Sequence, residues 1–203
     1  MNVEIISDDQ RDALQEIVNI GMGQAGASIA RVLGEFVELS VPQISAVDAD
    51  AIPVTLATLA GSGVASAVRQ AFLGELRGEA IVIFTEHSAS DLAELLSYGN
   101  EVDGPASREL LLDISNVLVG ACLGGIAELL HAEIGFSAPS LLADQVAPGE
   151  LVQAETIAAR CALLVEVRFG LEKRVFRSHL VMLMPEDAVA ALQRALDRFI
   201  EEI

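Results

Sequence analysis

The chain has 203 residues, of which 52% are hydrophobic and 4% are aromatic. Its 30 Asp and Glu residues outnumber 12 Lys and Arg residues, which gives a formal net charge of -18. The apolar content excludes a disordered chain. The acidic charge excludes nucleic acid and anionic lipid as partners, because phosphate groups attract Lys and Arg. We therefore expect a globular protein with an aliphatic core.

The first hundred residues predict a long helix, about three strands and a second helix. Ser7 and Gln10 match a capping box, which predicts the start of the long helix. Apolar residues then recur at a helical period, and Gly34 predicts the end. The remaining predicted elements are strands near residues 36–41, 67–76 and 79–84 and a helix over about residues 88–98.

An uncharged run at residues 51–68 is long enough to be considered as a membrane span. Because it contains Pro53 and two glycines, we predict a loop and the edge of a strand there. The first residues lack the basic start and apolar stretch of a signal peptide. Cys122 and Cys161 lie in apolar runs, which predicts buried free thiols in a reducing compartment. These features together predict a soluble cytoplasmic protein.

The second half repeats the pattern of the first. Its predicted elements are a helix at residues 107–131, strands near 134–138, 162–171 and 173–183, and a helix at 185–200. Neighbouring strands joined by short turns favour an antiparallel or mixed sheet. We therefore predict an α/β protein of the α+β type, with a sheet covered by helices.

An internal repeat organises the sequence. A displacement of 97 positions lays residues 12–42 over residues 109–139, and Leu, Ile, Asn, Gly, Ala, Ser and Pro residues coincide along the overlap. Two copies predict a pseudo-two-fold unit, whereas a solenoid needs at least about three. We predict a single domain over residues 1–203, built of two repeats at about residues 1–100 and 101–203.

The first helix of each repeat carries a polar face. At about 100° per residue, four positions of each helix fall within an arc of about 60°, opposite the apolar positions. They are Asp12, Glu16, Asn19 and Gly23 in the first repeat and Glu109, Asp113, Asn116 and Gly120 in the second. Small residues continue the stripe in the first repeat, at Gly26, Ala27 and Ala30. They predict a shallow groove that the backbone of another protein could approach.

Acidic and amide side chains on an exposed helix face are most often only solvated. Here an acid three residues before an Asn, and a Pro 23 residues after it, recur in both copies. Solvation alone does not require this spacing, although descent from a duplicated ancestor would also preserve it. The prolines, Pro42 and Pro139, are interpreted as structural residues that fix the chain where it enters a strand.

The spacing Asp12-x3-Glu16-x2-Asn19-x22-Pro42 resembles the signature of the CheC, CheX and FliY phosphatases of bacterial chemotaxis. The second copy resembles it again, as Glu109-x3-Asp113-x2-Asn116-x22-Pro139. Two copies in about 200 residues are most similar to the CheC type.

The resemblance implies hydrolysis of the aspartyl phosphate on a CheY-like response regulator. It implies that Asn19 and Asn116 position the attacking water and that Glu16 pairs with a Lys of the regulator. No cofactor of the chain's own is implied, since the Mg²⁺ would be bound by the regulator. The deamidase CheD is a further partner that members of this family can bind.

The second copy departs from the family pattern. Asp113 stands where the family has Glu, which shortens the reach of the carboxylate by about one methylene. Glu109 stands where Ser or Asp is usual. We therefore expect Glu16 and Asn19 to form the stronger site and Asp113 and Asn116 the weaker one.

Two other functions remain open from the sequence: a module that binds the regulator without hydrolysing it, and an adaptor for CheD. A metal site is not expected, because His87, His131 and His179 are isolated from acids at ligand spacing. No phosphate-binding Gly-x-x-x-x-Gly-Lys loop occurs in the sequence.

Overall fold

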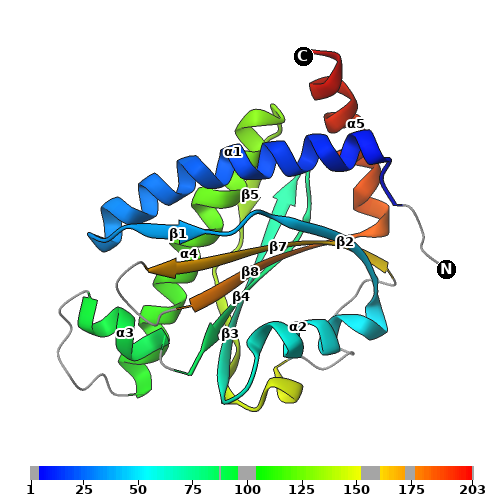
Figure 1. Ribbon diagram of the computed structural model, residues 1–203. Coiled ribbons are helices and arrows are strands. Elements are labelled where there is room, and N and C mark those ends of the chain that lie inside the picture. The colour runs from blue at the N-terminus through cyan, green and yellow to red at the C-terminus, as the bar shows by residue number, and fades with distance from the viewer. Residues whose placement is uncertain (1–4, 87, 96–103, 152–160, 172–176, 203) are drawn as a thin grey trace.

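The computed structural model describes residues 5–86, 88–95, 104–151, 161–171 and 177–202. They form an eight-stranded sheet with helices on both faces (Figure 1), which confirms the predicted α/β class. His87, the predicted end of a helix at residue 98 and the predicted start of a strand at residue 173 lie outside the described residues.

The helices and strands follow each other in a similar order in the two halves. The first half contains α1 (Asp8–Leu33), β1 (Val37–Leu39), β2 (Gln43–Asp48), η1 (Ala49–Ala51), α2 (Ile52–Ala60), β3 (Ala65–Gly74), β4 (Gly78–Thr85) and α3 (Ser88–Leu95). The second contains α4 (Gly104–Leu129), β5 (Ile134–Phe136), β6 (Ser140–Val146), η2 (Pro148–Glu150), β7 (Cys161–Leu171), β8 (Arg177–Pro185) and α5 (Glu186–Glu201). This common order supports the two-repeat organisation, which stays a prediction.

The sheet interleaves strands from both halves. Its order is β1-β7-β8-β4-β3-β5, with β2 also paired to β7 and β6 also paired to β3. Each of these pairings is antiparallel. Because β7 lies between β1 and β8, strands of the second half complete the sheet of the first.

The signals at the ends of α1 are confirmed. The Ser7 side chain accepts a hydrogen bond from the backbone N–H of Gln10 at 3.2 Å, and the Gln10 side chain accepts one from the Ser7 N–H at 3.1 Å. This capping box satisfies two N–H groups that a helix start would otherwise leave unpaired. Gly34 ends the helix in the left-handed conformation, with φ at 71°.

His131 occupies the matching left-handed position after α4, with φ at 50°. A side chain with a Cβ is strained in this conformation, whereas glycine is not. We expect His131→Gly to raise the free energy of unfolding by about 0.5–1 kcal/mol, and Gly34→Ala to lower it by about 1 kcal/mol. Urea titration of both variants measures these changes. Equal stability of the three proteins would contradict the expectation.

The structure corrects the prediction for residues 51–68, because residues Ile52–Ala60 form helix α2. Pro53 lies in the first turn, where a helical N–H has no partner in any case, so the proline is tolerated. Ile52, Leu56 and Ala60 recur at a helical period and are buried. The prediction treated Pro53 as a breaker when it marks a helix start.

Strands β2 and β6 were not predicted. Exposed and half-buried residues make up β2, so its sequence lacks the alternation that identifies a strand with one buried face. Both strands are fixed by partners from the other half, β2 by β7 and β6 by β3. These pairings join segments that lie far apart in the sequence. They add one strand to each half, so the described residues of each half form four strands and not about three.

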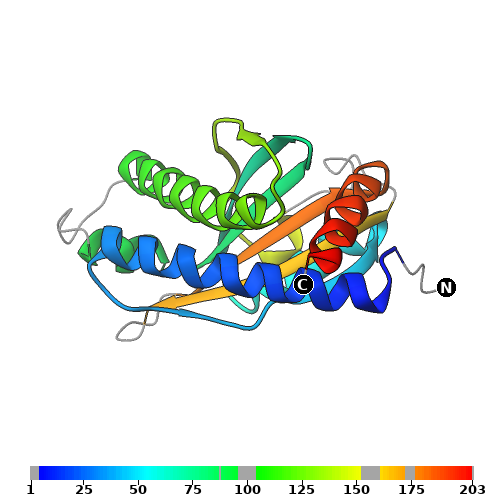
Figure 2. The same cartoon turned by 90° about the horizontal axis from the view of Figure 1, so that it is seen from above.

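Two apolar layers enclose the sheet. Helices α1, α4 and α5 cover one face and form the larger core with Val68, Phe72 and Phe169. Seen from above, α1 and α4 lie side by side over this face (Figure 2). Helix α2 covers the other face, where Leu56 packs with Ile81.

Helix α4 is long and apolar enough to cross a membrane by length and composition alone. In the folded chain its apolar residues are buried against α1 and the sheet, and 61% of its most apolar window is buried. This burial accounts for the hydropathy of α4 as that of a core helix. A cytoplasmic location stays a prediction.

The two long helices cross at a pair of glycines. A Cβ built on Gly21 would lie 3.1 Å from the backbone N of Ile126, and a Cβ on Gly125 would lie 3.1 Å from the Cα and carbonyl O of Gly21. The backbones of α1 and α4 therefore touch at this point. The contact fixes the two helices that carry the predicted site residues relative to each other.

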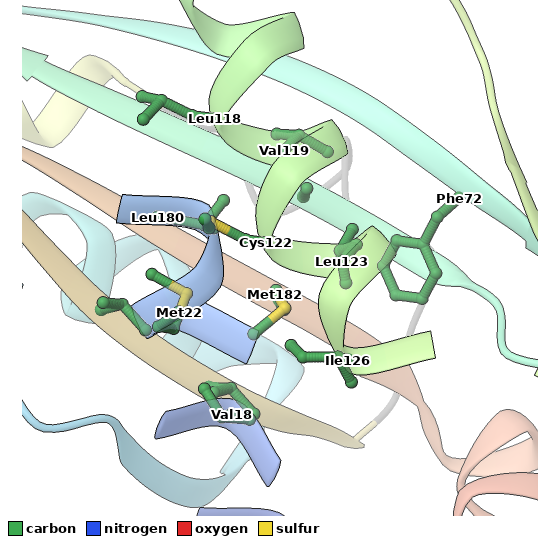
Figure 3. Close-up of a cluster of buried hydrophobic side chains, with 14 of the residues drawn as sticks. Val18, Met22, Phe72, Leu118, Val119, Cys122, Leu123, Ile126, Leu180 and Met182 are labelled. Atoms are coloured by element: carbon green, nitrogen blue, oxygen red, sulfur yellow. The ribbon is translucent and has the colours of Figure 1, made fainter. Parts of the chain in front are cut away.

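Cys122 is a buried free thiol in the main core, where Figure 3 shows it among Met22, Leu180 and Met182. This confirms the prediction for Cys122, whereas the side chain of Cys161 lies outside the described residues. Burial raises the pKa of the Cys122 thiol well above its ordinary range. The thiol therefore stays neutral in the folded protein.

In a Cys161→Ser background we expect Cys122 to react with a thiol reagent only as the protein unfolds. The unfolded thiol ionises from about pH 8.5, whereas the folded one does not. The stability that this difference in ionisation contributes is therefore complete below about pH 8.5. Above that pH the free energy of unfolding falls by up to about 1.4 kcal/mol per pH unit. The free energy of unfolding between pH 7 and 10 should fall more steeply than in the Cys122→Ala variant. Parallel curves for the two proteins would contradict this.

Candidate functional site

The exposed face of α1 carries the predicted acid and amide. Glu16 and Asn19 are exposed, whereas Ile17 and Val18 between them are fully buried in the core. Asp12 is exposed one turn before Glu16. The helical period therefore predicted the direction of these side chains correctly, while their chemical role stays a prediction.

A shallow hollow of about 270 Å³ lies over this face. It is lined by Asp12, Gln15, Glu16, Asn19 and Val41. The first four belong to α1, and Val41 belongs to the segment between β1 and β2. The lining contains two carboxylates and no cation, so a phosphate group could approach only together with cations from a partner.

The Asn19 side chain makes no hydrogen bond to any other part of the chain that the structure describes. Its amide is exposed and free to turn. A carboxamide can accept hydrogen bonds through its oxygen and donate two through its nitrogen. Asn19 can therefore present either end to a molecule bound in the hollow.

Helix α4 presents the second set of predicted residues. Glu109, Asp113 and Asn116 are exposed, while Ile114 and Leu118 are buried. The predicted polar face is thus observed on both long helices. The structure does not combine the two sets into one site, because one set lies on α1 and the other on α4.

The second set includes a contact that the sequence did not reveal. Gln70 on β3 donates a hydrogen bond from Nε2 to Asn116 Oδ1 at 2.9 Å and another to the Ser137 carbonyl O at 2.8 Å. Gln70 is buried, with 2% of its surface exposed. A polar residue between Val68 and Phe72, at an inward position of a strand, was the available signal.

Residues 10–45 match the model of the CheC-like family. The match covers less than half of the 203 residues. The matched segment contains Asp12, Glu16, Asn19 and Pro42, the residues on which the sequence resemblance depends. The CheC-like segment therefore includes α1, β1 and the start of β2.

Solved structures share the fold of this chain at low sequence identity. FliY of Thermotoga maritima matches with a TM-score of 0.74 and 18% identity, over 96% of this chain and 98% of that one. FliM in a FliM–SpeE complex from H. pylori matches with 0.68 and 11%, over 98% and 100%. CheX in a complex with CheY, BeF3 and Mg²⁺ from Borrelia burgdorferi matches with 0.51 and 14%, over 81% and 96%.

The prediction of a groove of small residues along α1 is partly wrong. A Cβ on Gly23 would meet nothing within 4 Å, so that end of the stripe is open. At Gly26, however, a Cβ would lie 2.9 Å from Leu39 Cδ1, because β1 of the same chain packs there. On α4 a Cβ on Gly120 would also meet nothing within 4 Å.

Pro42 and Pro139 lie outside the polar faces. Pro42 is buried and immediately precedes β2, and Pro139 is half-buried and immediately precedes β6. Their positions confirm that each stands where the chain enters a strand. Neither lines the hollow over α1.

Among the described residues, no group of three or more His, Cys, Asp or Glu side chains could hold a metal ion. His131 is exposed after α4. His179, which the sequence analysis treated as isolated, lies with Nδ1 3.1 Å from Glu166 Oε1 across neighbouring strands. The strand register produces this pair, and residue spacing could not show it.

Proposed function

We propose that this CheC-like chain hydrolyses the aspartyl phosphate of a CheY-like receiver domain. The observation that carries the proposal is the pair Glu16 and Asn19, exposed together on one face of a helix whose other face is buried. The pair borders a hollow of about 270 Å³ and lies inside the segment that matches the family. The CheX relative in complex with CheY supports a receiver as the partner.

The amide of Asn19 is suited to position the water that attacks the aspartyl phosphate. An acyl phosphate is already reactive, so its hydrolysis needs a water held in line with the leaving carboxylate. The Asn19 oxygen can accept a hydrogen bond from that water, and its nitrogen can donate one to the water or the phosphoryl group. The water oxygen then bonds to phosphorus, the bond to the aspartyl oxygen breaks, and the water proton leaves with phosphate or solvent.

The carboxylate of Glu16 suits the docking step. Glu16 is expected to pair with a Lys of the receiver, which fixes α1 against the phosphorylation site. The charge that develops on the phosphoryl oxygens is expected to be neutralised by Mg²⁺ bound to the receiver. This division of roles agrees with a hollow that contains carboxylates and no cation.

The second site is proposed to work in the same way through Asp113 and Asn116. Both side chains are exposed on α4. The shorter Asp113 carboxylate is expected to make a weaker contact with the receiver, so Glu16 and Asn19 carry most of the turnover.

The direct test is release of inorganic phosphate from phosphorylated receiver domains of the same organism. The full chain should accelerate release above the receiver's own decay, and the acceleration should require Mg²⁺. A chain that binds phosphorylated receiver, measured by fluorescence anisotropy, without accelerating release would contradict the phosphatase proposal.

That outcome would favour the alternative, a module that binds the receiver without hydrolysis. The fold similarity to FliM gives this alternative its support, because the match extends over 98% of this chain. A role as a CheD adaptor also stays a prediction, since no described contact bears on it.

A further inference from the structure

Two hydrogen bonds of the Gln70 side chain fix the orientation of the Asn116 amide. The Ser137 carbonyl O can only accept, so at 2.8 Å it must face the nitrogen of the Gln70 amide. The second N–H of that nitrogen points to Asn116 at 2.9 Å, so Asn116 must offer its oxygen. The Asn116 Oδ1 therefore faces β3, and Nδ2 is left for solvent.

Stability does not explain the presence of Gln70. Its own Oε1 is buried and has no hydrogen-bond partner among the residues that the structure describes. An unpaired buried acceptor costs free energy, and an apolar residue at the same place would avoid this cost. Val167 on β7 is the matching residue of the repeat, 97 positions further along the chain, and it is apolar and fully buried.

Gln70 and Val167 occupy equivalent places in the two copies of the repeat. The hydrogen bonds of two matching serines support this equivalence in addition to the sequence spacing. Ser137 N donates to the Ala71 carbonyl at 3.0 Å, and Ser137 Oγ accepts from Ala71 N at 3.0 Å. Ser40 makes the same two bonds to Arg168, each at 3.0 Å. The residues before Ala71 and Arg168 are Gln70 and Val167.

We infer that Gln70 is a positioning residue for Asn116 and that it makes the two proposed sites unequal. This inference rests on the proposed function. The Asn116 amide is already oriented, so less side-chain entropy is lost when the attacking water is aligned in the transition state. Its oxygen keeps a second lone pair for the attacking water. No hydrogen bond from a described residue holds the Asn19 amide, and Val167, which matches Gln70, is apolar, so Asn19 has to be ordered when the water is aligned.

The activity test uses an Asn19→Ala background, in which only the second site can turn over. There Gln70→Leu is expected to lower kcat for phosphate release about 3- to 10-fold, because the amide is no longer held. The dissociation constant for the receiver should stay unchanged, since Asp113 and the helix surface are intact. The melting temperature should change by less than about 3 °C, because exposed Asn116 can be hydrated.

Ser66→Ala in the same background is the matched control. Ser66 is also buried on β3, but its hydroxyl bonds Asp144 and Gln145, and it makes no hydrogen bond to Asn116 among the described residues. We expect this variant to retain kcat. A loss of kcat in Ser66→Ala equal to that in Gln70→Leu would overturn the inference, because any damage to β3 would then suffice. An unchanged or higher kcat in Gln70→Leu would also overturn it.

A second readout is independent of catalysis. Both Nε2 protons of Gln70 are hydrogen-bonded and buried, so the side-chain amide signal in NMR spectra should exchange slowly with water. In Asn116→Ala the exchange should be faster. Fast exchange in the wild type would overturn the inference even if the chain is a phosphatase. Slow exchange in a chain that does not accelerate phosphate release would instead contradict the proposed function and leave the contact between Gln70 and Asn116 supported.

Discussion

The Asn19→Ala, Asn116→Ala double variant is expected to lose about 10²-fold or more of the rate at which phosphate is released from the receiver. A water that is no longer aligned with the leaving group costs a factor of this order. The two sites act in parallel, so their rates add, and each single variant keeps the rate of the remaining site. Asn19→Ala should therefore reduce turnover more than Asn116→Ala, and neither should reach the loss of the double variant.

The double variant should still bind phosphorylated receiver, because Glu16 and Asp113 are unchanged. Gln24→Ala is the matched control, since Gln24 is an exposed amide on α1 that does not line the hollow. Turnover at the wild-type level in the double variant would remove the catalytic assignment. A loss in Gln24→Ala would show that any change to the surface of α1 disturbs activity.

Gly125→Leu is expected to lower the free energy of unfolding by about 1–3 kcal/mol or more. Its Cβ would lie 3.1 Å from the Cα and carbonyl O of Gly21, so α1 and α4 would have to move apart. For a chain of this length the melting temperature should fall by about 2–4 °C per kcal/mol. Thermal and urea unfolding measure both changes.

The adjacent Gly124 provides the control. A Cβ there would meet nothing within 4 Å, and Gly124→Ala is expected to raise stability by about 1 kcal/mol through helix propensity. Leu and Ala are both good helix formers, so opposite effects at neighbouring positions isolate the helix crossing. Equal stabilisation by both substitutions would show that the helices are not in contact at Gly125.

Local signals predicted the elements that carry the site. The capping box at Ser7 and the glycine at position 34 located α1 to within a residue at each end, because both act within one helical turn. The helical period then separated exposed Glu16 and Asn19 from buried Ile17 and Val18. The α/β class followed from the alternation of long helical and strand segments.

Contacts between distant segments could not be predicted in this way. Strands β2 and β6 depend on partners in the other half of the chain. Gln70 meets Asn116 across 46 positions, and Leu39 covers Gly26 from a neighbouring strand. Each depends on how α1 and α4 sit on the sheet, which no short window of sequence contains.

The interleaved strand order has a consequence for how such a chain can change. Strands β1 and β2 have only β7 as a partner, and β5 and β6 have only β3, among the described pairings. Deleting either half would leave strands of the other without their partners, so we expect that neither half folds stably when it is expressed alone. The two exposed helix faces can still come to differ through point substitutions, such as Gln70 at the place where the matching residue Val167 is apolar.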